Sequence, residues 1–150
     1  LPPVCEATTR SGPAGPLSGI RVLDLSAYIA GPYGCTLLAD MGADVIKIES
    51  PQGDSMRGAP PFVEGESAPF MLWNRNKRGL KLDLKNEDDL KVFWDLVDGA
   101  DVVLENFRPG VMKRLGLGWD ELHARNKRLV LGSISGCILH SKCFDDITCN

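Results

Sequence analysis

The feature that most constrains the fold is a pair of apolar segments separated by the length of one helix. GIRVLDLS, residues 19–26, is a nearly continuous apolar run, as a strand buried on both faces of a sheet requires. AGPYGCTLLADMG follows it, and there Gly31 suits a tight turn and Pro32 suits the first helical position. ADVIKIES, residues 43–50, is a second apolar run. A strand, a helix and a strand within about 30 residues predict a parallel pair joined by a crossover helix. In that helix Leu37, Leu38 and Met41 lie on one side, which we expect to be the buried side.

The rest of the chain repeats this alternation. Residues 51–69 are rich in Pro, Gly and polar residues, so we expect a long loop there, of the kind that is usually functional or mobile. Beyond it the patterns predict a strand at 80–84, a helix capped by Asn86, a strand at 100–107, two short helices and a last strand at 128–135. The order predicts an α/β fold with an open, mainly parallel Rossmann-like sheet, helices on both faces, and a sheet that is incomplete in this chain. Ligands of such sheets bind at the carboxyl ends of the strands.

Length and composition indicate a soluble globular class. A chain of 150 residues is one domain or part of a larger one. Its hydrophobic content of 43% and charged content of 25% are ordinary for such proteins. There is no apolar run of about 18 residues, so we expect no membrane-spanning segment. Five irregularly spaced Cys argue against a disulfide framework and favour a reducing compartment, which predicts the cytoplasm, or the mitochondrial matrix if the host is eukaryotic.

The pattern divides the chain into three regions. Residues 1–16 are rich in Pro, Gly, Ser and Thr and lack the apolar segment of a secretory signal, which predicts a flexible leader. Residues 17–136 carry the coherent pattern and are the predicted domain, and residues 137–150 form a divergent tail. The tail holds four potential zinc ligands, but because their spacing matches no standard finger we predict no metal site: Cys137, His140, Cys143 and Cys149.

Dinucleotide binding is the first function to consider for this fold. The turn after the first strand reads AYIAGPYG, with only Gly31 and Gly34, where a dinucleotide-binding turn reads G-x-G-x-x-G. Glu49, at the end of the second strand, is a possible partner for a ribose hydroxyl and keeps NAD binding open as an alternative. Pro32 and the missing glycines argue against it.

A block of positive charge stands out in a chain whose net charge is -3. NRNKRGLKLDLK, residues 74–85, contains five basic residues, which form either a solvated face or a binding site for a phosphorylated ligand: Arg75, Lys77, Arg78, Lys81 and Lys85. Nucleic acid is a poor candidate, since the chain is acidic overall and Trp73 is the only aromatic residue close to the block. Arg108 and Arg114, which follow the fourth strand, are expected at the same end of the sheet.

Several blocks of the sequence, in order, resemble the family III CoA-transferases of the CaiB/BaiF type. The first reads LSGIRVLDLS, AGP and LADMGADVIKIESPQGDSMR, and NRNKRGLKLDLK, ADVVLENFRPGVMKRLGLG and RLVLGSISG continue it. Together they cover Leu17–Gly136. The resemblance implies that this region binds coenzyme A (CoA) and acyl-CoA as substrates, with no permanently bound cofactor. The positions that match the family's CoA-contacting motifs are Ala30, Gly31, Arg57, Leu82, Lys85, Asn106, Phe107, Arg108 and Arg114.

The resemblance also implies a mechanism whose nucleophile this chain lacks. In the family an Asp attacks the acyl-CoA thioester, and an aspartyl-CoA intermediate then passes CoA to a second carboxylic acid. That Asp follows a glycine-rich segment after SISG, whereas here SISG continues as CILHSKCFDDITCN. Asp145 and Asp146 lie in a polar tail that is not expected to bury or orient them, so we predict no catalytic residue in this chain.

Four interpretations therefore remain open. The chain is the CoA-binding part of a CoA-transferase, a CoA-binding fragment without chemistry, a non-functional truncated product, or part of an acyl-CoA racemase, whose N-terminal motifs are the same. The family forms interlocked homodimers, which a fragment need not form. The oxalate and formyl-CoA subgroup tends to carry Gln before AGP, where this chain has Ile29, and this difference disfavours oxalate as a substrate.

Overall fold

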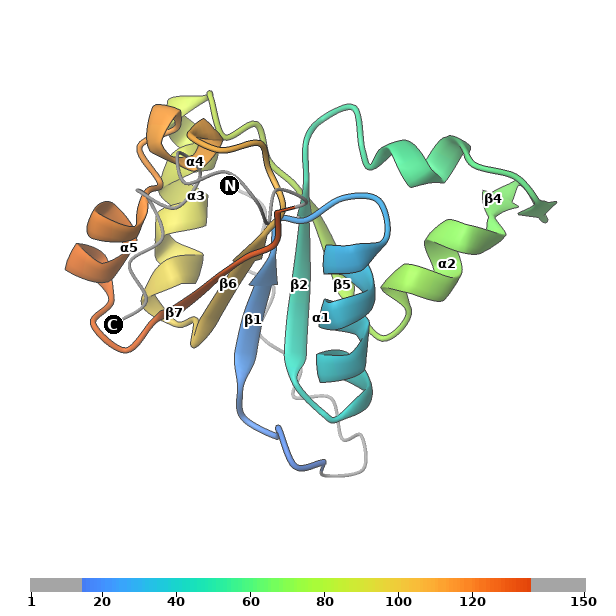
Figure 1. Ribbon diagram of the computed structural model, residues 1–150, viewed down its shortest axis with the longest axis horizontal. Coiled ribbons are helices and arrows are strands. Elements are labelled where there is room, and N and C mark those ends of the chain that lie inside the picture. Colours follow the sequence, from blue (N-terminus) through green and yellow to red (C-terminus); the bar gives the residue numbers. More distant parts are fainter. Residues whose placement is uncertain (1–14, 136–150) are drawn as a thin grey trace, which may run out of the picture.

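The structure is a computed structural model that describes residues 15–135 of the chain. Its centre is a five-stranded sheet in the order β5-β2-β1-β6-β7, with every neighbouring pair parallel (Figure 1). The strands are β1 (Arg21–Asp24), β2 (Asp44–Glu49), β5 (Arg78–Lys81), β6 (Val102–Glu105) and β7 (Val130–Ser133). The order reverses between β1 and β6, and such a switch point is where open α/β sheets bind ligands. The predicted open, parallel sheet is confirmed.

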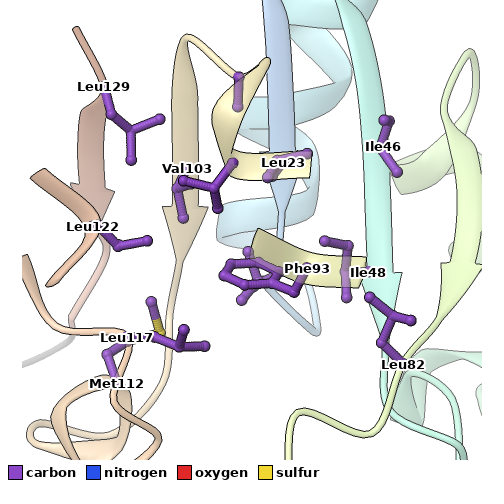
Figure 2. Close-up of a cluster of buried hydrophobic side chains, with 13 residues drawn as sticks. Leu23, Ile46, Ile48, Leu82, Phe93, Val103, Met112, Leu117, Leu122 and Leu129 are labelled. Carbon is purple, nitrogen blue, oxygen red and sulfur yellow. The ribbon is translucent and has the colours of Figure 1, made fainter. Parts of the chain in front are cut away.

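Helices cover both faces of the sheet, as predicted (Figure 1). One face is covered by α1 (Ala30–Asp40), and the other by α3 (Glu87–Asp98), α4 (Val111–Arg114) and α5 (Trp119–Arg125). The larger core lies on the α3 side, and Figure 2 shows Phe93 of α3 near its centre. Phe93 is fully buried, and burying a side chain of this kind contributes roughly 1.5–3 kcal/mol. No helix in residues 15–135 is long and apolar enough to cross a membrane.

The start of α3 follows the prediction from sequence. The Asn86 side chain accepts hydrogen bonds from the backbone N–H groups of Asp88 and Asp89, at 2.9 and 3.2 Å. Three acidic residues occupy the first turn, where the positive end of the helix dipole favours them. The helix therefore begins at a cap that satisfies two of its free N–H groups, and the acidic first turn that follows suits its dipole.

The region between β2 and β5 is more structured than the sequence indicated. The predicted loop at 51–69 contains a 3-10 turn, η1 (Ser55–Gly58), and an antiparallel hairpin of β3 (Phe62–Val63) and β4 (Glu66–Ser67). Helix α2 (Ala68–Asn74) follows, and the Ser67 side chain caps it by accepting a hydrogen bond from the Phe70 N–H at 3.3 Å. The predicted strand at 80–84 is also shifted, because the last residue pair of β2 and β5 is Glu49 with Lys81. Leu82 adds one more hydrogen bond to β2 and lies just outside the strand.

Helix α1 packs on the core differently from the prediction. Leu37 and Met41 are 41% and 40% exposed, so their assignment to the buried side is wrong, whereas Leu38 packs against the smaller core. The residues that meet the sheet are small and spaced by four, namely Gly31, Cys35 and Ala39. Small residues let the helix axis approach the sheet closely, and this close packing turned the side chains of Leu37 and Met41 outward.

Candidate functional site

A cleft with a volume of about 220 Å³ opens at the carboxyl ends of the central strands. Its position is the one expected for a ligand site in an open parallel sheet, beside the switch point between β1 and β6. Segments that follow β1, β2, β5 and β6 supply its walls. The lining residues are Leu25, Ser26, Ala27, Lys47, Ile48, Glu49, Ser50, Gly53, Asp54, Leu82, Asp83, Leu84, Lys85, Phe107 and Leu115.

The apolar part of the cleft comes from the larger core. Leu25, Ile48 and Leu82 are buried, while Phe107 and Leu115 are half-buried against the same cluster. Leu82 is fixed there because its backbone N–H donates to the Glu49 carbonyl at 2.9 Å, which extends the β2–β5 pairing by one bond. A flat apolar group can therefore lie against side chains that are already ordered by core packing.

Asn106 joins the segments that follow β1 and β6 at the switch point. The Ala27 N–H donates to Asn106 Oδ1 at 2.9 Å, and Asn106 Nδ2 donates to the Ala27 carbonyl at 2.8 Å. The amide thus pairs with the backbone as a neighbouring strand would, after the regular ladder of β1 and β6 has ended. This reciprocal pair fixes the wall that Ala27 contributes to the cleft.

Three of the predicted cations stand exposed around this edge, namely Lys85, Arg108 and Arg114. Lys85 lines the cleft, and Arg108 and Arg114 are the sequence neighbours of two lining residues, Phe107 and Leu115. Within residues 15–135 none of the three forms an ion pair with a carboxylate. Their charges are therefore available to an anionic ligand.

Ala30 and Gly31 open α1 beside the cleft but do not line it. Gly31 is packed so tightly that a Cβ atom at its position would lie 2.3 Å from Ser26 Cβ. The predicted site residues thus divide into three that line the cleft, Leu82, Lys85 and Phe107, and others that surround it or hold its walls.

Arg57, another predicted contact, is engaged within the protein. Its Nε and Nη2 donate to the two oxygens of Glu49 at 2.8 and 2.7 Å, and its guanidinium lies 3.9 Å from the Phe70 ring centroid. Burial acts to raise the pKa of Glu49, but the hydrogen bonds from Arg57 and the Asp54 N–H outweigh it and hold that pKa below the ordinary value.

The basic block of residues 74–85 divides between structure and surface. Arg75 pairs with an aspartate at the end of α1 and Arg78 with one at the start of β2. The side chain of Lys77 is only 2% exposed, and its Nζ donates to Asp24 Oδ2 and to the Pro32 carbonyl, both at 2.8 Å. Burial lowers the pKa of Lys77, and its pairing with Asp24 opposes that shift. Only Lys85 of this block lines the cleft.

Sequence reasoning missed two charged side chains inside the sheet, Asp24 and Lys47. Together with Glu49 they are buried and lie on the α1 side of β1 and β2, toward the carboxyl ends. A signal was present, since Asp24 interrupts an apolar run in VLDLS and Lys47 does so in VIKIES. Glu49, which the sequence offered as a partner for a ribose hydroxyl, pairs with Arg57 instead. A buried charge inside a strand requires a partner, and those partners come from loops that the pattern does not place.

Comparison with known proteins identifies the family. The family model described as CoA-transferase family III matches residues 17–138. The chain belongs to CoA-transferase family III. Its relatives include the acetyl-CoA:oxalate CoA-transferase of Acetobacter aceti, 47% identical over 130 residues, which are 86% of this chain and 33% of that protein. The succinyl-CoA:mesaconate CoA-transferase of Haloarcula hispanica is 47% identical over 127 residues, 81% of this chain and 32% of that protein.

Solved structures of family III proteins agree with the fold. Rv3272 from Mycobacterium tuberculosis superposes with a TM-score of 0.77 at 42% identity, over 83% of this chain and 35% of that one. A CaiB/BaiF family protein from Brucella suis gives a TM-score of 0.78 at 41% identity, over 82% and 34% of the two chains. The chain therefore spans about a third of the length of the curated relatives it matches. The expectation drawn from Ile29 about oxalate stays a prediction.

Proposed function

We propose that residues 17–136 are the CoA-binding part of a CoA-transferase that moves CoA between carboxylic acids. The observation that carries this proposal is the cleft at the switch point, where an apolar floor adjoins exposed cations that have no carboxylate partner within residues 15–135. CoA has the matching chemistry, because its flat adenine is attached to a ribose that carries a 3′-phosphate and a pyrophosphate. Family membership supports the same ligand.

The cleft suits the adenine end of the ligand. Its volume of about 220 Å³ accommodates one end of CoA, so the remainder of the molecule would extend along the edge of the sheet. Leu82 and Phe107 would contact the ring, and the charges of Lys85, Arg108 and Arg114 would neutralise phosphates. Arginine is suited to this role, since its planar fork donates two parallel hydrogen bonds to a phosphate.

We further propose that the chemistry proceeds through an aspartyl-CoA intermediate, as the family resemblance implies. The nucleophilic Asp belongs to a segment that the sequence after SISG does not match, and Asp145 and Asp146 lie outside the described residues. In this proposal residues 17–136 bind and orient CoA, and a separate segment supplies the covalent step. A transferase assay on the 150-residue chain is expected to show no turnover.

CoA binding is tested by thermal and urea unfolding of the chain with and without CoA. A ligand that binds only the folded state adds roughly 2.7 kcal/mol to the free energy of unfolding at about 100 times its Kd. Lys85→Ala and Arg114→Ala should each weaken CoA binding about tenfold or more, because a hydrogen bond to a charged group contributes roughly 1.5–3 kcal/mol.

Lys113→Ala is the matched control, since Lys113 is an exposed cation of the same helix as Arg114 and is not a predicted contact. It should leave the CoA Kd within a factor of about two, as a cation without a specific contact contributes little. Equal losses in Arg114→Ala and Lys113→Ala would indicate general attraction of an anion and would contradict a defined phosphate site. A wild-type chain that folds but gives no CoA-dependent shift would refute the proposed function.

A further inference from the structure

The polar wall of the cleft is built from two segments that β2 holds in place. One is the turn after β1, Ser26–Tyr28, and the other is the loop at 50–58. Lys47 of β2 connects them, although its side chain is only 3% exposed. Its Nζ donates to the Ser26 carbonyl at 2.8 Å and lies 3.0 Å from Asp54 Oδ2. A buried ammonium in the sheet therefore reaches both segments.

Asp54 makes the connection from the other side. Its Oδ1 accepts hydrogen bonds from the N–H of Met56, at 2.9 Å, and from the N–H of Tyr28, at 3.4 Å. Its Oδ2 accepts no hydrogen bond among the described residues, so the charge of Lys47 is what compensates the burial of that oxygen. Tyr28 has a φ of 68°, a backbone conformation that a bulky residue keeps only where its surroundings hold it.

Glu49 and Arg57 tie the same loop down at a second point. Glu49 Oε2 accepts from the Asp54 N–H at 3.0 Å as well as from Arg57. Arg57 in turn rests on Phe70 of α2, so the loop is attached to both the sheet and the neighbouring helix. The loop contributes Ser50, Gly53 and Asp54 to the cleft.

We propose that Lys47, Glu49, Asp54 and Arg57 form a positioning unit that holds the polar wall of the CoA cleft in its binding position. The unit contains two cations and two carboxylates, so it carries no net charge to offer a phosphate. Its contribution is geometric, and Arg57 acts through Glu49 rather than by contacting the ligand. This inference rests on the proposed function for the identity of the ligand, but the position of the loop is independent of it.

The first test is Asp54→Asn, which keeps the shape of the side chain and removes the charge that faces Lys47. Because the loop is then held less firmly, amide hydrogen exchange should accelerate at Gly53 and Arg57. Their N–H groups donate to the backbone carbonyls of Ser50 and Asp54, which the substitution does not remove. If the loop then occupies the binding position about a tenth of the time, the Kd for CoA rises about tenfold. Two readouts, one without ligand and one with CoA, thus report the same displacement.

Asp98→Asn is the matched control. Asp98 forms a two-bond pair with Arg125 at the end of α3, and neither residue lines the cleft. This variant should leave the loop exchange and the CoA Kd within about twofold of wild type, because within residues 15–135 Asp98 and its partner Arg125 share no partner with the positioning unit.

Arg57→Lys and Arg57→Met distinguish positioning from direct phosphate contact. Lysine keeps the charge but cannot make two parallel hydrogen bonds to Glu49, so a positioning role predicts that both variants weaken CoA binding to a similar degree. A lysine variant that binds as wild type does, beside a weak methionine variant, would assign Arg57 to the ligand and overturn its positioning role.

Other outcomes also overturn the inference. Unchanged loop exchange in Asp54→Asn would show that the ion pair does not hold the loop. Faster exchange with an unchanged CoA Kd would show that the loop position does not matter for the ligand. If the wild-type chain binds no CoA, the proposed function fails, while the exchange measurement still decides whether the unit holds the loop.

Discussion

At the scale of single residues, the buried charges determine how this site is built. Asp24 is fully buried, and its Oδ1 accepts hydrogen bonds from both the N–H and the hydroxyl of Ser26 while Oδ2 accepts from Lys77. Removing one member of such a set leaves an uncompensated charge in the interior, which typically destabilises a protein by about 3–5 kcal/mol. The strand ends beside the cleft are therefore fixed by specific partners as well as by apolar packing.

Cys35 gives a direct test of this interior. It is fully buried in α1, and burial raises the pKa of its thiol well above the ordinary value, with the nearby Asp24 carboxylate raising it further. Because the thiolate is the reactive form, alkylation of Cys35 in the folded chain should be at least about a hundredfold slower than in urea. Peptide mass spectrometry after timed iodoacetamide treatment measures both rates. Similar rates in the two conditions would mean that α1 does not pack as described.

The roles of some single residues could be predicted from the sequence, and those of others could not. Asn86 as a helix cap was predictable, because a cap and its acidic first turn are neighbours in the sequence. Lys77 was not, since its partner Asp24 is 53 positions away. Leu82, Lys85 and Phe107 were placed near a ligand by family resemblance, and the structure puts them in one cleft. Their contact with CoA remains a prediction.

At the scale of elements, local pattern predicted the strands that are buried on both faces and the helices with clear caps. Strands β1, β2 and β6 lie within the predicted ranges, and α3 begins after the predicted cap, because each of these elements contributes buried residues to a core cluster or packs against one. The pattern failed between β2 and β5, where the hairpin and α2 are short and depend on contacts with η1 and α1. Short elements of this kind have too few residues for a period to be recognised.

The close approach of α1 to the sheet can be tested with two glycines of the same helix. Gly31→Ala would place its Cβ 2.3 Å from Cβ and 2.5 Å from Oγ of Ser26, which is itself held by Asp24. This overpacking should lower the free energy of unfolding by about 1–3 kcal/mol. Gly34→Ala is the control, because nothing lies within 4 Å of its Cβ position, and it should raise stability by roughly 0.5–1 kcal/mol. Urea unfolding measures both, and effects of the same sign would contradict this packing.

At the scale of the whole molecule, α1, α2 and the hairpin expose many large apolar side chains. Seven such side chains on these elements or at the α1 cap are exposed by 40% or more, and together they are called the apolar surface: Tyr33, Leu37, Met41, Phe62, Val63, Met71 and Leu72. Helices that are apolar on both sides are usually covered. The chain spans about a third of the length of its curated relatives, so this surface is a reason to expect the 150-residue chain to self-associate.

Replacing Leu37 and Leu72 with Lys tests that expectation. The double variant should remain monomeric at protein concentrations where the wild-type chain forms larger species, because two charges interrupt the apolar surface. Sedimentation velocity across a concentration series measures the difference. Val92→Lys is the control, since Val92 is exposed to a similar degree on α3, away from this surface. A wild-type chain that stays monomeric and unfolds cooperatively would contradict the prediction.

On the side of β1 and β2 that faces α1, the side chains change from apolar to charged halfway along the strands. Val22 and Val45 lie near the amino ends and pack under α1, whereas Asp24 and Lys47, two residues further along each strand, belong to the charged set beside the cleft. Mutational tolerance should follow this boundary. The amino half could then be repacked for thermostability in a combinatorial library without changing the proposed ligand site, because the two sets of residues lie at different ends of the same two strands.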